Sequence, residues 1–357
     1  MAGDAFSVRE RRVVVVGAAR SGVAAAELLA KRGALVTLTE ARDGFDSADR
    51  LRACGVRLEL GGHRPETLAG ADLVVVSPGV PVEQSVFEAA RERGVEIIGE
   101  LELASRWIRG RVIAVTGTKG KSTTTTLIGR MLDAAGQRVL VGGNIGVPLC
   151  AQVDASTVDT LHVVEASSFQ LETTTTFRPW IGVWLNVADD HLDRHPSFDA
   201  YVSAKARIFA NQTADDWALV NADDSVVTAR TAGVVSRRVP FALSGRIAAG
   251  FVVDDEWIVK RTAAGAERLV PVAAVELDAG AAAGLGAGAA RDRSVALTHS
   301  RSHGRRQETH DAGRRFQRLV QRSGPAGRAR GLLARARQHG DSSEWLWHLG
   351  AHAAHPR

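Results

Sequence analysis

One segment of the chain combines glycines, lysines and hydroxyl groups at a spacing suited to binding phosphate. It lies between an apolar run, Val112 to Val115, and an amphipathic stretch, Thr124 to Ala135, which predicts the order strand, turn, helix. Such a turn directs backbone N–H groups and a helix N-terminus toward anionic oxygens. Lys121 would reach the terminal phosphates and Ser122 would offer its hydroxyl to Mg²⁺. The segment therefore predicts a nucleoside triphosphate site made of Gly117, Thr118, Lys119, Gly120, Lys121, Ser122 and Thr123.

Three side chains further along the chain could complete this site. Glu165 ends a predicted strand that begins at Leu161, and a strand-end carboxylate near a phosphate loop is a natural Mg²⁺ ligand. His191 follows the next predicted strand and could hold a second metal ion or contact a phosphate. Lys205 lies on a helix predicted over Phe198 to Phe209. For His191 an ordinary hydrogen-bonding role, and for Lys205 a solvated charge, remain the alternatives.

A second glycine-rich segment runs from Gly142 to Gly146, after a predicted strand that ends at Val141. Its glycines allow a close backbone approach, and Asn144 can both donate and accept hydrogen bonds. The segment is therefore either a substrate-contacting loop or a plain turn.

The elements around these residues predict two α/β domains. In the first, strands at Arg12–Val16, Leu35–Thr39 and Leu73–Val76 accompany a helix at Val23–Lys31. Glu40 lies nineteen residues after Ser21, close to the spacing at which an acid meets a ribose. Because Ala19 replaces the second glycine of the dinucleotide pattern, a mononucleotide site at the strand ends is favoured.

The second domain alternates predicted strands with helices or loops. The strands fall at 112–115, 138–141, 161–165 and 181–185, and a further strand is predicted from Leu269 to Leu277. Such alternation is typical of a mostly parallel sheet, whose ligands lie at the carboxyl ends of the strands. The candidate residues fall at these ends.

The composition changes at about residue 279. Residues 279–357 carry fourteen arginines, no lysine and five acidic residues, so residues 1–278 sum to −4 in a chain of net charge +5. A nucleic-acid partner would therefore depend on the tail alone, and none is predicted. The tail has no sustained period of 2 or 3.6, which predicts disorder or an out-of-frame reading of a GC-rich gene; a genuine basic extension is the alternative.

Other features of the sequence exclude several classes of protein. Cys54 and Cys150 are the two cysteines, and no disulfide framework is predicted. The charged start of the chain, Met1 to Arg12, has no apolar core of the secretory kind, and no run approaches the ~20 apolar residues of a membrane helix. A soluble cytoplasmic protein without a membrane partner is expected.

Taken together, these segments resemble one family. The loop Thr116 to Thr123, which lacks an early glycine at Val115, resembles the ATP loop of the Mur ligases and the related folylpolyglutamate synthases. The segments Gly142–Gly146, Glu165–Glu172 and Asn186–Arg194, with the turn Ser77-Pro78-Gly79, resemble the D-glutamate-adding branch of peptidoglycan precursor synthesis. The resemblance extends from about residue 10 to residue 277.

This resemblance implies a reaction and its partners. A carboxylate of UDP-N-acetylmuramoyl-L-alanine attacks the γ-phosphate of ATP, and the amine of D-glutamate then displaces phosphate from the acyl phosphate. A monomer is expected, and the resemblance implies the catalytic residues Lys121, Glu165, His191 and Lys205. Two Mg²⁺ ions would be held by Ser122, Glu165, His191 and Lys205, with Lys205 carbamylated by CO₂. The substrate-binding residues would be Arg20, Ser21, Ala41, Arg42, Ser77, Pro78, Gly79, Asn144 and Ser167.

The resemblance also sets the expected domains. Residues 1–109 would form a Rossmann-like UDP-sugar-binding domain, and residues 110–278 a central P-loop-type ATP-binding domain of the α/β class. The family continues into a third, Rossmann-like domain that binds the amino acid. Residues 279–357 do not match it, so this domain is expected to be missing or frameshifted. The alternatives are then an impaired remnant that binds without turnover and a sister ligase for another amino acid.

Overall fold

A computed structural model describes residues 6–190, 194–243 and 247–274 of the chain. These residues divide into two compact units, one ending at Pro240 and the other beginning at Phe241. The predictions for His191 and for the tail from residue 279 lie outside the described residues. Cys54 and Cys150 are free thiols, as expected. None of the helices in the described ranges has the length and apolar character needed to cross a membrane.

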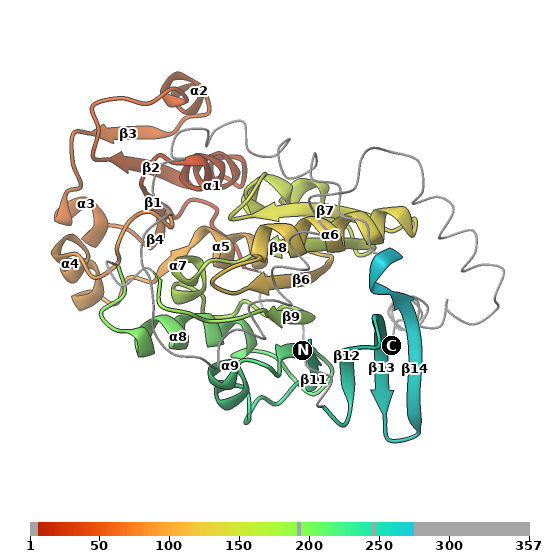
Figure 1. Cartoon of the computed structure of the whole chain (residues 1–357). Coiled ribbons are helices and arrows are strands. Elements are labelled where there is room, and N and C mark those ends of the chain that lie inside the picture. The colour runs from red at the N-terminus through yellow and green to blue at the C-terminus, as the bar shows by residue number, and fades with distance from the viewer. Residues whose placement is uncertain (1–5, 191–193, 244–246, 275–357) are drawn as a thin grey trace, which may run out of the picture. The chain divides into compact units, whose positions relative to one another are not determined.

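The first sheet has five parallel strands in the order β3-β2-β1-β4-β5 (Figure 1). Its strands are β1 (Arg12–Val16), β2 (Leu35–Glu40), β3 (Arg57–Leu60), β4 (Leu73–Val76) and β5 (Ile97–Gly99). The helical elements are α1 (Arg20–Lys31), α2 (Ala48–Ala53), α3 (Pro65–Ala69), η1 (Ser85–Phe87), α4 (Glu88–Glu92) and α5 (Glu100–Ser105). Valines fill β1 and β4 because both faces of a covered parallel sheet are buried. The α/β prediction for this region is confirmed.

The strand order of this sheet reverses between β1 and β4, where open α/β sheets bind ligands. At this point the Ser77 hydroxyl donates to the carbonyl oxygen of Gly17 at 2.9 Å. A Cβ at Gly22 would lie 1.9 Å from the same oxygen, so α1 can begin this close to the strand end only with glycine there. The turn after β1 is shorter than predicted, because α1 begins at Arg20.

The second sheet of the first unit is also parallel, in the order β7-β8-β6-β9-β10. Its strands are β6 (Arg111–Thr116), β7 (Arg138–Gly143), β8 (Thr160–Glu165), β9 (Ile181–Trp184) and β10 (Trp217–Asn221). The helical elements are α6 (Lys121–Ala134), η2 (Leu149–Ala155), α7 (Ser168–Glu172), α8 (Phe198–Ala206), η3 (Arg207–Phe209) and α9 (Ser225–Arg230). The carboxyl ends of β6, β8 and β9 are neighbours at one edge of this sheet.

Two elements end well before their predicted last residues. The helix predicted to Phe209 is α-helical only to Ala206 and continues as a 3₁₀ turn, a common way for a helix to end. The strand predicted over Leu269 to Leu277 ends at Pro271, and Val272–Ala274 forms a 3₁₀ turn, η4. Pro271 pairs with Trp257, the first residue of β13, so the pairing stops where the partner strand does. Residues 275–277 lie outside the described part of the chain.

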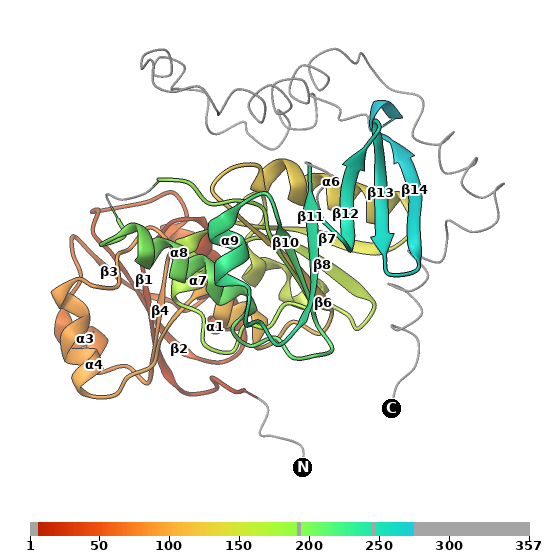
Figure 2. The ribbon, with the colours of Figure 1, turned by 60° about the horizontal axis from the view of Figure 1, so that its bottom comes forward.

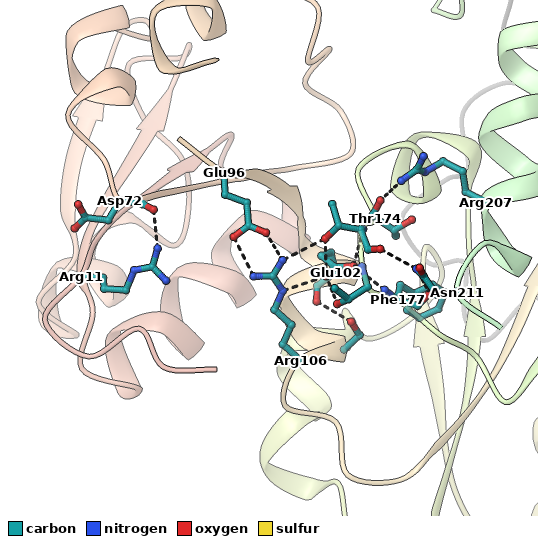
Figure 3. A network of polar contacts seen from close by, with 12 residues as sticks. Arg11, Asp72, Glu96, Glu102, Arg106, Thr174, Phe177, Arg207 and Asn211 are labelled. Carbon is teal, nitrogen blue, oxygen red and sulfur yellow. Dashed lines mark hydrogen bonds and ion pairs between the residues drawn. The ribbon is translucent and has the colours of Figure 1, made fainter. Parts of the chain in front are cut away.

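A buried carboxylate joins the two sheets of the first unit (Figure 3). Glu102 of α5 has no exposed surface, and its Oε2 accepts the N–H groups of Thr175, Thr176 and Phe177 at 2.9 to 3.0 Å. Its Oε1 accepts the Nε–H of Arg106 at 3.0 Å, and Arg106 also pairs with Glu96. Because residues 175–177 precede β9, these bonds fix α5 against the second sheet.

A second buried acid of α5, Glu100, has a raised pKa. Glu100 is buried, its Oε1 accepts the N–H of Cys150, and its Oε2 has no hydrogen-bond partner. Burial raises the pKa of Glu100 to about 7, an effect that the hydrogen bonds from Cys150 reduce only in part. The folded chain therefore favours the protonated acid.

We expect Glu100→Gln to flatten the dependence of stability on pH. A raised acid pKa means that stability is fully present below the unfolded value near 4.5 and falls as the pH rises toward about 7, by roughly 3 kcal/mol. Glutamine cannot ionise, so the variant should lose less stability between pH 5 and pH 8 than the parent chain. Urea titrations at the two pH values give the comparison; parallel losses in both proteins would contradict the assignment.

The second unit contains a short antiparallel array (Figure 2). Strands β12 (Gly250–Asp254), β13 (Trp257–Thr262) and β14 (Gly265–Pro271) pair in order, and the end of β11 (Arg237–Ala242) pairs with β12 in parallel. The β12–β13 turn has two residues, Asp255 and Glu256, with φ of 44° and 63°. Positive φ at both positions is the requirement of a type I′ turn, which prefers glycine second.

Glu256→Gly is expected to stabilise this hairpin by about 0.5–1 kcal/mol, because glycine adopts positive φ without a Cβ penalty. Hydrogen exchange of the β12 and β13 amides measures the effect locally. Ala264→Gly, in the β13–β14 turn, is the matched control; it adds flexibility where no positive φ requires it, and should speed exchange there. Faster exchange in Glu256→Gly would refute the strain at this turn.

Candidate nucleotide and substrate site

The loop after β6 has the backbone geometry of a phosphate cradle. Gly117 and Gly120 have φ of 155° and 83°, and Gly120 is the N-cap of the fourteen-residue helix α6. No side chain caps this helix, so the N–H groups of its first turn face the loop without a side-chain acceptor. A Cβ at Gly117 would lie 3.0 Å from Leu185, so the close approach to the neighbouring loop also favours glycine. The arrangement suits an anion at the helix N-terminus.

Asn186, which sequence reasoning gave no separate role, shapes this loop. Its Oδ1 accepts the N–H groups of Thr118 and Lys119 at 3.0 and 2.9 Å, and its Nδ2 donates to the carbonyl of Lys119. Those two amides are therefore bonded to Asn186. The signal in the sequence is an asparagine just after a strand that neighbours β6, but only the sheet order brings it to the loop.

Two lysines converge on one carbonyl of the loop. Lys121 Nζ donates to the carbonyl oxygens of Gly117 and Thr118 at 2.9 and 3.0 Å, and Lys205 Nζ donates to Gly117 at 2.9 Å. Lys205 is 1% exposed and lies over the Tyr201 ring. Burial, reinforced by the positive charge of Lys121, lowers the pKa of Lys205 to about 7. Lys205 is thus a buried amine with a large neutral fraction, not the solvated charge considered as its alternative.

The acid, the hydroxyl and the amide predicted for the site meet at the end of β8. Ser122 Oγ donates to Glu165 Oε2 at 2.6 Å, and Asn144 Nδ2 donates to Glu165 Oε1 at 2.7 Å. A carboxylate beside a hydroxyl fits Mg²⁺, which takes one or two carboxylates and otherwise phosphate and water oxygens. No group of three or more His, Cys, Asp or Glu side chains gathers within the described ranges. A metal ion here would therefore depend on phosphate oxygens as well.

The residues predicted for the UDP moiety follow the carboxyl ends of β1, β2 and β4 in the first sheet. Arg20 donates from the start of α1 to the carbonyl of Gly146 at 3.1 Å. Arg42 pairs with Glu40, whose carboxylate also accepts the N–H of Ala18 at 2.6 Å. Hydrogen bonding from Arg42, and next from Ala18, outweighs burial and lowers the pKa of Glu40 to about 2. The predicted residues Ser21 and Ala41 flank these groups in the chain. Glu40 is thus committed to protein donors at the place where a dinucleotide acid would meet a ribose.

Three more of the predicted substrate residues already take part in hydrogen bonds within the protein. The Ser167 hydroxyl caps α7 by accepting the N–H of Gln170 at 3.2 Å, in a capping box. The carbonyl of Gly79 accepts Arg194 Nη1 at 3.2 Å, and the guanidinium of Arg194 lies 4.4 Å from the Phe169 ring centroid. The carbonyl of Pro78 lies 3.5 Å from Arg194 Nη2. Arg194 therefore brings a positive charge from the second sheet to the Ser77–Gly79 turn, a contact that sequence reasoning did not foresee.

Comparison with known proteins agrees with this arrangement. Residues 11–99 match the Mur ligase MurD-like N-terminal domain, and residues 115–256 match the Mur ligase middle domain. A UDP-N-acetylmuramoylalanine–D-glutamate ligase of Desulfosudis oleivorans is 49% identical over 69% of this chain and 54% of its own length. One of Acidobacterium capsulatum is 45% identical over 76% of this chain and 60% of its own. The chain thus spans between half and two thirds of these relatives.

Among solved structures, the UDP-N-acetylmuramate:L-alanyl-gamma-D-glutamyl-meso-diaminopimelate ligase from Neisseria meningitides aligns with 73% of this chain and 84% of its own. The identity is 19% and the TM-score 0.49. The two domain matches together cover more than half of the sequence and contain the phosphate loop, Glu165 and Lys205. The chain belongs to the Mur ligase family, with an N-terminal domain of the MurD-like type and the family's middle domain.

Proposed function

We propose that this chain carries the UDP-sugar-binding and ATP-binding parts of a ligase that adds D-glutamate to UDP-N-acetylmuramoyl-L-alanine in peptidoglycan precursor synthesis. The observation that carries the proposal is the convergence of Lys121, Ser122 and Glu165 at the ends of β6 and β8. The specific substrates are suggested by relatives up to 49% identical that have this ligase name. The proposal includes a cytoplasmic location and a monomeric state.

In the proposed reaction, the substrate carboxylate attacks the γ-phosphate of ATP, the bond to the β,γ-bridging oxygen breaks, and an acyl phosphate and ADP form. The amine of D-glutamate then attacks the acyl carbon, phosphate leaves, and the amine loses a proton as the amide forms. Lys121 would swing from the carbonyls of Gly117 and Thr118 to neutralise the β- and γ-phosphates. The amides of residues 120–123 would hold phosphate oxygens, and Asn144 would orient the substrate near its reacting carboxyl. The contribution of the site is positioning and charge neutralisation.

The metal ions belong to the same proposal. Mg²⁺ would neutralise phosphate charge, and Ser122 with Glu165 would hold one ion. Lys205 would help to hold a second ion after its neutral amine attacks CO₂, losing a proton and forming a carbamate. The lowered pKa of Lys205, near 7, keeps part of the amine in the reactive form. His191 would complete this second ion's ligands.

One experiment separates the proposal from its alternatives. The full chain is titrated by calorimetry with MgATP, UDP and UDP-N-acetylmuramoyl-L-alanine, and then assayed for phosphate release with D-glutamate and other amino acids. Binding of MgATP and of the UDP compounds, together with phosphate release that depends on D-glutamate, supports the ligase. Binding without release favours the impaired remnant, release with another amino acid favours a sister ligase, and no binding of the UDP compounds refutes the proposal.

A further inference from the structure

A network of three buried polar side chains connects residues 109–110, which lead into the second sheet of the first unit, to the turn that contains Asn144. It consists of Ser156, His162 and Gln152, which are 5%, 0% and 4% exposed. Ser156 lies just beyond η2, Gln152 within it, and His162 in the middle of β8. None of the three belongs to the residues that we assign to ATP, metal or substrate.

The donors and acceptors of this network can be assigned in only one way. Gln152 Nε2 lies 3.3 Å from the carbonyl of Val141 and 3.2 Å from that of Val147, so the amide nitrogen must donate to both. Gln152 Oε1 then faces His162 Nδ1 at 3.1 Å and must accept, which places the imidazole proton on Nδ1. His162 is neutral, since burial lowers its pKa to about 4.

This tautomer also fixes the hydrogen bonds at the Ser156 end of the network. Because Nδ1 carries the proton, His162 Nε2 is an acceptor, and Ser156 Oγ, 2.8 Å away, must donate to it. The two lone pairs of Ser156 Oγ accept the N–H groups of Arg109 and Gly110 at 3.0 and 3.2 Å. Residues 109–110 are the connection that enters β6. Every donor and acceptor is therefore used, which makes a buried polar network rigid.

The Gln152 end of the network holds the turn that contains Asn144. The carbonyl of Val147 accepts both Gln152 Nε2 and the N–H of Gly143, which closes the turn. A Cβ at Gly142 would lie 2.2 Å from Gln152 Nε2 and 2.1 Å from the Val147 oxygen, so glycine is required for Gln152 to approach. Within the closed turn, Asn144 donates to Glu165 through both its backbone N–H and its side chain, at 2.9 and 2.7 Å.

We propose that Gln152 and His162 are positioning residues that fix Asn144 and, through it, Glu165 for the reacting end of the UDP-linked substrate. This inference rests on the proposed function. The positioning acts on the acyl end of the substrate and not on its uridine end, which binds at the first sheet. Loss of the network should therefore weaken the binding of UDP-N-acetylmuramoyl-L-alanine and leave that of UDP unchanged.

The test compares these two ligands by calorimetry on the full chain. Gln152→Met keeps the side-chain length but removes both donors, and is expected to weaken the affinity for UDP-N-acetylmuramoyl-L-alanine about tenfold with UDP affinity unchanged. His162→Leu should act alike. His162→Asn, whose Nδ2 is bonded to Cγ as Nδ1 is, keeps the donor to Gln152 and should restore most of the affinity. Equal affinities in Gln152→Met and the parent chain would overturn the inference.

A second measurement uses the parent chain alone, so it does not depend on whether a variant folds. In the full chain labelled with ¹⁵N-histidine, His162 should give a slowly exchanging Nδ1–H signal that stays constant between pH 5.5 and pH 8.5. A proton on Nε2, or a titration in this range, would overturn the assigned direction of the network. Failure of the parent chain to bind either UDP compound would instead refute the proposed function, so the two failures are distinguishable.

Discussion

Glu102→Ala is expected to lower the free energy of unfolding by about 4 kcal/mol, the scale of breaking a buried, fully hydrogen-bonded charge. The change leaves three successive amides, of Thr175, Thr176 and Phe177, buried without their acceptor (Figure 3). It also removes one of the acids that neutralise Arg106. Urea denaturation followed by circular dichroism measures the loss, and Glu92→Ala, at an exposed position on α4, is the control.

The pH dependence identifies the carboxylate as the cause. Burial opposes ionisation of Glu102, but the hydrogen bonds from Thr176, Thr175 and Arg106 outweigh it and lower the pKa. A lowered acid pKa gives stability that is present above the unfolded value near 4.5 and lost as the pH falls through the folded value. The difference between the parent chain and Glu102→Ala should therefore shrink in acid. A constant difference from pH 7 to pH 3 would mean that packing, and not charge, is lost.

Lys121→Ala is expected to weaken the binding of MgATP about a hundredfold and to abolish any ATP-dependent product formation. In the proposed function the ammonium would lie against the β- and γ-phosphates, and a hydrogen bond to a charged group contributes up to about 3 kcal/mol. Arg130→Ala is the control, because Arg130 is an exposed basic residue on α6 and lies outside the loop. Calorimetry with MgATP gives the affinities of both variants.

Thermal melting without ligand guards this prediction against a trivial result. Lys121 also donates to the carbonyls of Gly117 and Thr118, so its removal could loosen the loop itself. A variant that melts like the parent chain but fails to bind MgATP has lost the phosphate contact. Parent-like affinity in Lys121→Ala would remove Lys121 from the site.

Much of the fold could be predicted because it depends on local patterns. The strands Arg12–Val16 and Leu73–Val76 were predicted to the residue, since runs of valine between turn residues have few other uses. The parallel character of both sheets followed from the alternation of strands and helices. The end of β14 at Pro271 was missed, because the apolar pattern continues past this residue, whereas the partner strand β13 begins opposite it at Trp257.

The site divides in the same way between local and non-local information. By itself, the sequence located the glycine-rich loop after β6, the strand-end Glu165 and the Ser77–Gly79 turn. Each of them can be recognised from a short contiguous run of residues. Only the tertiary structure decided that Asn186 uses two loop amides, that Lys205 is buried against Gly117, and that Arg194 contacts Gly79. The physical reason is that burial, and the pKa shifts and hydrogen-bond directions that follow from it, depend on which strands become neighbours. Strand order is set by packing across the whole sheet, and no local run of residues contains it.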